Sequence, residues 1–446
     1  MKKLGFQKVR SGLQLIAINL LVLFGFLELG SLGFYWIKNQ QLFYTRQKIE
    51  DYQALGINLE GVRFGETVVE RLHPFFGFVQ KPGPDFRPGF KYNNYGFIAP
   101  EDYPFKKTNP NQFLIGVLGG SVASNYAIYE VRNKVLEKTI RQVPGLQNKE
   151  VVILPLAIGG YKQPQQLLVL NYMLSVGQEF DLVINLDGFN EVALVTLNHK
   201  RGLDLTMPSA SHVQPLTSLA NNSLSTKALK TLLNIKENKA QLNQSLKILK
   251  DCKLASCHLI NSLKVQGLTR QYRQNLQKFE QQRLSNDDDQ ESIIFFYTQD
   301  PDIPDPEFYQ QAADYWMKTS LLMQQTLSQN QIPYLHVLQP NQYWKTARKF
   351  GSEEKKIAFT ENSPYAKGVE IGYPLLLKNV DQLTKSQVNI LNATNIFDPI
   401  QEPVYIDNCC HYNPRGEKIL SEFVAREVVN QLRSKNSNNK SPRLPN

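Results

Sequence analysis

Short apolar runs alternate with segments of helical periodicity along most of the chain. Four runs have the length and continuous hydrophobicity of strands buried in a parallel sheet: Phe113–Leu118, Val151–Ile158, Asp181–Leu186 and Tyr334–Leu338. Helical spacing marks another four segments: Val131–Arg141, Gln165–Leu174, Pro306–Gln329 and Pro414–Leu432. Strands that alternate with helices in this way predict a three-layer α/β/α sandwich around a parallel sheet.

The N-terminal pattern differs, because an apolar run from Leu13 to Ile37 contains a single charged residue, Glu28. This run exceeds the length of about 20 residues that a bilayer core requires. Four basic residues precede it, and Tyr35 and Trp36 are typical of a membrane interface. A cleaved signal peptide is the alternative, but the run is long and no A-x-A site follows it. We therefore predict a cytoplasmic segment at 1–12, a transmembrane anchor at 13–37, and the remainder outside the cytoplasm.

Three further segments depart from the α/β pattern. Residues 38–111 are rich in Gly, Pro and aromatic residues, which predicts an extended, turn-rich lead-in over a domain surface. Within the α/β domain predicted at 112–432, the stretch at about 217–300 lacks proline and repeats leucine at helical intervals, which indicates a helical insertion. The polar, basic tail at 433–446 is predicted to be disordered.

The charge of the chain is concentrated in this insertion. Hydrophobic residues make up 42% of the sequence, enough for a packed core, and the formal net charge is +10. Between Lys227 and Arg283 stand twelve basic and three acidic residues, a local net charge of +9. A solvated helical face usually mixes both signs. We therefore expect the insertion to meet an anionic lipid surface or an acidic glycan, with a solvated face as the alternative, and the predicted compartment disfavours nucleic acid.

Candidate catalytic residues follow three successive predicted strands. Ser121 stands after Gly119-Gly120, where a serine at a strand-to-helix turn projects at the carboxyl edge of a parallel sheet. Gly160 and Asn190 follow the next two strands, and a glycine N–H and an asparagine amide are suitable oxyanion donors. Ser121 alone also fits a helix N-cap. The sequence around it is neither the G-x-S-x-G nucleophile elbow nor a phosphate-binding loop.

The general base is sought among six histidines. His411 precedes a helix opened by Pro414, and Asp407 stands four residues upstream, so an imidazole that takes the proton of Ser121 would have a carboxylate to orient it. His336 lies inside an apolar strand and is expected to be packed. The chain has no H-E-x-x-H or C-x-x-C motif, so no metal site or cofactor is predicted. Of the four cysteines, Cys252 and Cys257 either form a small disulfide loop or remain free thiols.

The ordered set of motifs resembles the four blocks of the SGNH/GDSL hydrolase superfamily, and the lead-in resembles that of membrane-anchored bacterial members. The blocks are Gly119-Gly120-Ser121, the Gly160 of IGGY, Gly188-Phe189-Asn190, and an Asp and a His before a helix. The resemblance implies Ser121 as nucleophile and one oxyanion donor, Gly160 and Asn190 as the other donors, and His411 as base. In the family Asp usually stands three residues before His. Asn408 occupies that position here, so Asp407 is the favoured orienting residue and Asn408 the alternative.

These residues imply a serine-dependent esterase or O-acyltransferase that acts on an acylated glycan or lipid outside the cytoplasm. The same serine would serve both reactions, so hydrolase and transferase remain open. One alternative is a catalytically degenerate SGNH domain that acts as a binding or assembly factor for envelope polysaccharide. Another is a membrane-tethered scaffold whose basic helices bind the partner.

Overall fold

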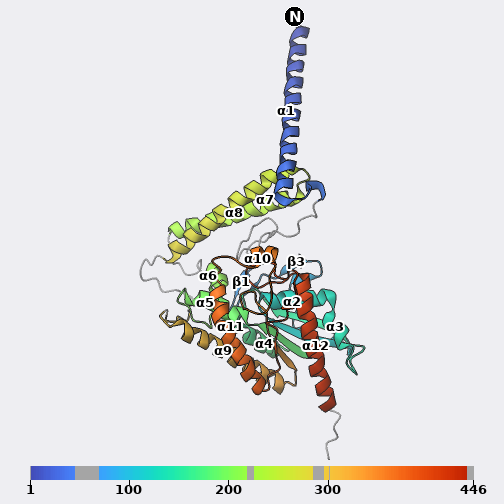
Figure 1. Ribbon diagram of the computed structural model, residues 1–446, viewed down its shortest axis with the longest axis vertical. Coiled ribbons are helices and arrows are strands. Elements are labelled where there is room, and N and C mark those ends of the chain that lie inside the picture. Colours follow the sequence, from blue (N-terminus) through green and yellow to red (C-terminus); the bar gives the residue numbers. More distant parts are fainter. Residues whose placement is uncertain (1, 46–69, 218–225, 285–295, 301, 439–446) are drawn as a thin grey trace, which may run out of the picture. The chain divides into compact units, whose positions relative to one another are not determined.

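The computed structural model of this chain describes residues 2–45, 70–217, 226–284, 296–300 and 302–438 (Figure 1). The chain divides into two compact units. Unit 1 comprises Met1–Val68 and Asn221–Ser292, and unit 2 comprises Val69–Ala220 and Ile293–Asn446. The helical insertion thus groups with the N-terminal helix rather than with the sheet.

A parallel five-stranded sheet forms the middle layer of unit 2, with strand order β10-β9-β8-β6-β7. The strands are β6 (Gln112–Gly119), β7 (Glu150–Ala157), β8 (Leu182–Asp187), β9 (Tyr334–Leu338) and β10 (Ile390–Asn392). Every residue of β6, β8 and β9 is buried, as expected for strands covered on both faces. The predicted parallel sheet is confirmed, and β10 is an additional short strand at its edge.

Helices cover both faces of this sheet, which confirms the three-layer arrangement (Figure 1). One face carries α2 (Ser121–Asn133), α3 (Val135–Ile140) and α12 (Pro414–Asn438). The other carries α4 (Gln165–Ser175), α5 (Phe189–His199), α9 (Asp305–Gln329) and α11 (Ala366–Lys385). The shorter helices α6 (Ala210–Thr217) and α10 (Ser352–Ala358) lie in connections.

The described part of the lead-in forms short antiparallel strands instead of a purely extended segment. A pair joins β1 (Glu70–His73) to β2 (Gly77–Gln80), and a three-stranded sheet contains β3 (Gly83–Arg87), β4 (Phe90–Tyr92) and β5 (Ile98–Ala99). Phe76, Phe78 and Phe97 are fully buried within the main core of unit 2. The aromatic residues of the lead-in therefore contribute to the core.

Two helix boundaries differ from the sequence-based prediction. The single helix expected at Val131–Arg141 is interrupted at Lys134, which has a left-handed φ of 53° and separates α2 from α3. The Glu130 carboxylate accepts the Leu136 N–H at 2.9 Å and so caps the second helix. The tail predicted to be disordered from residue 433 continues α12 as far as Asn438, and residues 439–446 lie outside the described part of the chain.

The described part of unit 1 contains the long helix α1 (Lys2–Asn39), the 3-10 turn η1 (Phe43–Thr45) and the hairpin of α7 (Thr226–Asp251) and α8 (Ala255–Leu284). Cys252 and Cys257 form a disulfide across the turn of the hairpin. The window Leu21–Lys38 of α1 has a mean hydropathy of 1.4 and is long and apolar enough to cross a membrane, a criterion that signal sequences also meet. The expected apolar helix and helical insertion are therefore both present.

Candidate active site

The ends of the three central strands bring the candidate residues to one edge of the sheet. Strand β6 ends at Gly119, where a φ of 141° turns the chain into α2, which begins at Ser121. A Cβ at Gly119 would stand 2.1 Å from the Leu186 carbonyl oxygen of the neighbouring strand β8. Only glycine satisfies both the backbone conformation and this approach, so the turn that presents Ser121 depends on it.

The loops after β7 and β8 meet beside Ser121. The Asn190 side-chain amide donates to the Tyr161 carbonyl at 2.7 Å, which joins the residue after Gly160 to the start of α5. A Cβ on Gly120 would fall 2.2 Å from the same Asn190 nitrogen, so this amide packs directly against the residue before Ser121. Ser121, Gly160 and Asn190 therefore belong to one cluster of loops, as their positions after successive strands predict.

A hydrogen-bonded chain links Ser121, His411 and Asp407. Ser121 Oγ lies 2.7 Å from His411 Nε2, and His411 Nδ1 forms a short hydrogen bond with an Asp407 carboxylate oxygen. The second oxygen of Asp407 accepts the backbone N–H groups of Cys409, Cys410 and His411 at 2.9 to 3.3 Å. The Asn408 amide instead donates to Thr360 Oγ1 at 3.2 Å. The loop thus directs Asp407 rather than Asn408 toward the imidazole, despite the extra residue between Asp and His.

The pKa values of Asp407 and His411 follow from the burial of these two groups and the contact between them. Burial disfavours the charged form of both groups, but the attraction and hydrogen bonding between them outweigh that penalty. The pKa of Asp407 consequently lies below its usual range, and the Asp407 carboxylate raises the pKa of His411 to about 9. The resting state at neutral pH is therefore an imidazolium–carboxylate pair, and the neutral imidazole that could accept a proton is the minor form.

Sequence reasoning missed the loop that holds Asp407 and His411 in place. Three consecutive side chains after β9, Asn341, Gln342 and Tyr343, donate to the backbone carbonyls of Cys409, Asp407 and Asn408 at 3.0, 3.1 and 2.9 Å. The partners stand 65 to 68 residues apart along the chain, so no local pattern identifies them. The sequence signal was limited to a polar run directly after an apolar strand, at the same sheet edge as the other loops.

Glu191 was also missed, and it ties two of the predicted loops together. Its buried carboxylate accepts the N–H of Gly188 at 2.8 Å and that of Gln163 at 3.1 Å, so it joins the start of α5 to the loop after Gly160. Burial, with the nearby Asp187, raises the pKa of Glu191 to about 8. A glutamate at the third position of a helix is a known capping signal and could have been recognised.

Comparison with known proteins leaves the family of this chain open. No family model matches the sequence, and no curated protein matches it. Among solved structures, the chain is similar to a GDSL-like lipase from Bacteroides thetaiotaomicron, with 9% sequence identity over 72% of this chain and 89% of that one. The TM-score is 0.33, a likeness too slight to carry an argument about fold or activity. The function of the site is therefore argued from its own residues.

Proposed function

We propose that unit 2 is a serine-dependent acyl-ester hydrolase or O-acyltransferase of the SGNH type. The observation that carries this proposal is the chain from Ser121 through His411 to Asp407 at the same sheet edge as Asn190 and Gly160. Nucleophile, base and orienting carboxylate within hydrogen-bond reach are the requirement for serine catalysis.

In the proposed reaction, Ser121 Oγ attacks the ester carbonyl while neutral His411 accepts its proton at Nε2. The Asp407 carboxylate accepts a hydrogen bond from the Nδ1–H of the same ring and stabilises the imidazolium that results. The oxyanion is stabilised by the N–H groups of Ser121 and Gly160 and by the Asn190 amide, which has two N–H donors and uses one for the Tyr161 carbonyl. Protonated His411 then donates to the leaving alkoxide. Water or the hydroxyl of a second molecule, deprotonated by the same histidine, takes the acyl group from Ser121.

A fluorophosphonate probe tests this proposal without knowledge of the substrate, because it reacts with activated serines. We expect one covalent adduct per chain, which peptide mass spectrometry assigns to Ser121, together with hydrolysis of a short-chain aryl ester. Addition of an acceptor alcohol to the same assay separates the two reactions, since a transferase forms the new ester in preference to free acid. An intact, folded protein that neither labels nor hydrolyses would favour the alternative of a degenerate binding or assembly domain.

We also propose that α1 crosses a membrane with its N-terminus in the cytoplasm and unit 2 on the opposite side. The apolar window of α1 and the basic residues that precede it support this orientation. In that compartment, acylated glycans and lipids are the ester substrates within reach. Fusion of a reporter enzyme that is active only outside the cytoplasm to residue 446 should give signal, whereas a reporter active only inside should not. The reverse pattern would contradict this orientation.

A further inference from the structure

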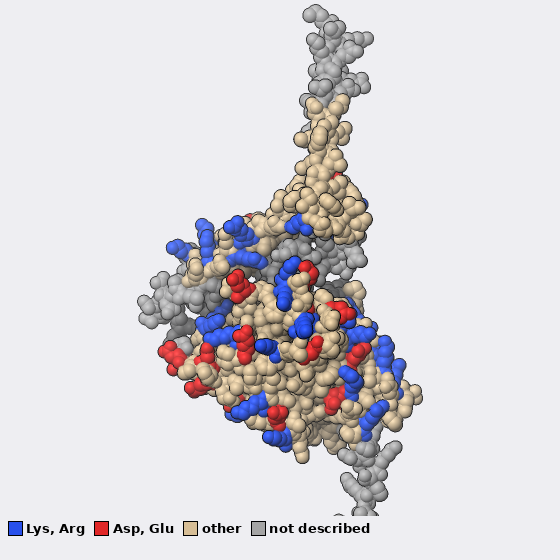
Figure 2. Space-filling view, in the orientation of Figure 1, with Lys and Arg blue, Asp and Glu red and all other residues tan. Residues whose placement is uncertain are grey.

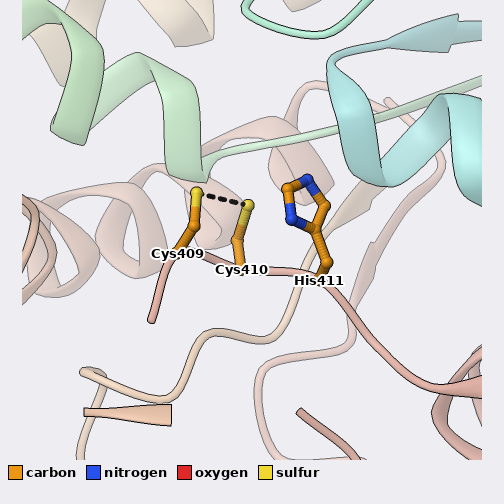
Figure 3. Close-up of side chains that lie close together, drawn as sticks. All are labelled: Cys409, Cys410 and His411. Carbon is orange, nitrogen blue, oxygen red and sulfur yellow. Dashed lines mark hydrogen bonds between the residues drawn. The ribbon is translucent and has the colours of Figure 1, made fainter. Parts of the chain in front are cut away.

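Two adjacent cysteines stand beside the proposed base, and neither has a role in the reaction above. The Sγ atoms of Cys409 and Cys410 lie 3.1 Å apart and point to the same side of the loop as the His411 ring (Figure 3). One ring nitrogen of His411 and both sulfur atoms lie within 4.8 Å of one another. Cys410 is buried and Cys409 is partly exposed.

The loop holds these thiols in a fixed arrangement. Asp407 accepts the N–H groups of both cysteines, and Asn341 donates to the Cys409 carbonyl. The side chains therefore converge without a change in the backbone of the loop. Two thiols and an imidazole are ligands of thiophilic d10 ions such as Zn²⁺ and Cd²⁺.

We propose that Cys409, Cys410 and His411 form a binding site for one thiophilic metal ion, a site that no motif in the sequence predicts. Zinc–sulfur bonds of about 2.3 Å and zinc–nitrogen bonds of about 2.0 to 2.1 Å place ligand atoms of one ion roughly 3.5 to 4 Å apart. The observed spacing is close to this, with the two sulfur atoms 3.1 Å apart and all three ligand atoms within 4.8 Å of one another. Both thiols lose their protons to solvent on binding, and the fourth position of the ion is open to water.

The ion would inhibit the proposed reaction rather than assist it. Both nitrogens of His411 already have partners, Ser121 and Asp407, so coordination of the ring must break one of these hydrogen bonds.

Titration of the full-length protein with Cd²⁺ tests this site, since cadmium thiolates absorb in the near ultraviolet. The Cys252→Ser/Cys257→Ser double variant is the suitable background, because Cys409 and Cys410 are then its only cysteines. We expect one Cd²⁺ per chain by native mass spectrometry, with the charge-transfer band, in the presence of a non-chelating reductant. Adding Cys409→Ser or Cys410→Ser should weaken binding by at least about tenfold.

Matched variants separate this inference from the proposed function on which its inhibitory effect depends. Ser121→Ala should keep the cadmium band even though it has no esterase activity, and circular dichroism should show that each variant is folded. Ester hydrolysis by the parent protein should fall as the band grows and return when a chelator is added. A band that survives in both single cysteine variants, or no band at all, would overturn the proposal.

A second inference concerns unit 1 and rests on different contacts. Glu28, the charged residue within the apolar run, accepts the N–H groups of Ala255 at 2.6 Å and Ser256 at 2.9 Å at the start of α8. Tyr35 contacts Phe43 and His258 edge to face, with ring centroids 5.2 and 5.3 Å apart. The turn of the hairpin is therefore attached to the C-terminal half of α1, within the window that can cross a membrane.

The surface near this turn combines apolar and basic side chains. Leu254, Ile260 and Leu263 are 40%, 55% and 57% exposed. Exposed basic residues lie among them and farther along both helices: Lys227, Lys230, Lys236, Lys247, Lys250, Lys253, Lys264, Arg270, Arg273 and Lys278. Figure 2 shows lysine and arginine side chains gathered over the hairpin. Exposed apolar side chains flanked by basic ones suit contact with an anionic membrane surface.

We infer that the α7–α8 hairpin lies on an anionic bilayer surface where α1 leaves the membrane. Continuity with α1 favours lipid over a soluble acidic glycan, because Tyr35, near the C-terminal end of the apolar window, contacts His258 at the start of α8. The apolar residues near the turn would enter the interface, and the lysines would meet lipid phosphates. This inference requires α1 to cross the membrane but does not require unit 2 to be an enzyme.

Limited trypsin digestion of the full chain in nanodiscs tests this surface, because the enzyme cleaves after lysine and arginine. In discs that contain phosphatidylglycerol we expect cleavage after Lys250, Lys253 and Lys264 to be several-fold slower than in phosphatidylcholine discs, with the difference lost at high salt. Lys138 and Arg141, exposed in unit 2, are the internal controls and should not respond. Protection by an added acidic polysaccharide instead of lipid, or no protection, would overturn the inference. Co-purification with the disc shows separately whether α1 has inserted.

Discussion

The described part of unit 2 contains two Ser–His–Asp hydrogen-bond networks, and their comparison shows what distinguishes a candidate active site from a structural network. In the second network, Ser320 Oγ lies 2.8 Å from His336 Nδ1, and His336 Nε2 lies 2.8 Å from Asp187 Oδ1. Its hydrogen bonds are as well formed as those of Ser121, His411 and Asp407. Hydrogen-bond geometry alone therefore cannot identify the nucleophile.

Solvent access and neighbouring donors separate the two networks. Ser320 and His336 are 0% exposed and Asp187 is 2% exposed, whereas the His411 side chain retains 24% exposure. The Asp187 carboxylate also accepts hydrogen bonds from the Trp316 indole and the Asn185 amide, each at 2.7 Å. The hydrogen bonds of the buried network thus join β8, β9 and α9. The solvent-accessible network that contains Ser121 lies beside Asn190 and Gly160, whose N–H groups could donate hydrogen bonds to a substrate carbonyl.

The largest contrast is expected from matched serine-to-alanine substitutions. Ser121→Ala removes the nucleophile and should reduce ester hydrolysis by about 10⁴-fold or more. Ser320→Ala should retain activity and lose about 1 to 3 kcal/mol of unfolding free energy, because it leaves a buried nitrogen of His336 without its partner. Steady-state kinetics and urea unfolding of both variants measure this contrast. Loss of activity in a folded Ser320→Ala protein, with Ser121→Ala still active, would reverse the two assignments.

A smaller but more specific effect is expected from the orienting residue. Asp407→Asn should lower kcat by roughly 10³- to 10⁴-fold, since the amide cannot stabilise the imidazolium. Asn408→Ala removes the hydrogen bond to Thr360 and should cost about tenfold or less. Comparison of kcat for the two variants decides between them. The opposite ranking would show that Asn408 rather than Asp407 supports His411.

The pH dependence of ester hydrolysis should reflect the pKa of His411, which the Asp407 carboxylate raises to about 9. The base must be neutral, and at pH 7 about one molecule in a hundred has it in that form. We therefore expect kcat/KM to rise about tenfold per pH unit below 9, roughly a hundredfold from pH 7 to 9, and then to level off.

Asp407→Asn is the control for this profile, because it removes the charge that raises the pKa of His411. Its residual activity should level off at a lower pH than that of the parent protein. A parent profile already flat at pH 7 would mean that the imidazole is not held as a cation in the free enzyme.

The sequence predicted the network of Ser121, His411 and Asp407 but not the buried one around His336, for physical reasons. Ser121 and Asn190 each follow a strand, and His411 precedes a helix, so strand ends and sequence order were enough to bring them to one edge. His336 was correctly expected to be packed, as its complete burial confirms. Its partners Ser320 and Asp187 come from the middle of a helix and the end of a strand, positions with no motif. Strand β10 was missed because it has only two apolar residues, both partly exposed, followed by the exposed Asn392, and so has no apolar run of strand length.

The smallest expected effect concerns the loop after β9, which holds Asp407 and His411 in place. Tyr343→Phe removes the hydrogen bond to the Asn408 carbonyl, and we expect kcat to fall several-fold with KM unchanged, since the substrate still binds while Asp407 and His411 are less well held. Tyr373→Phe is the matched control, because the Tyr373 hydroxyl donates to the Gln339 carbonyl at the other end of the same loop. Both variants should lose about 0.5 to 1.5 kcal/mol of unfolding free energy, but only the first should lose turnover. An equal loss of kcat in both would mean that general rigidity of the loop matters, rather than support of the residues that carry the proposed chemistry.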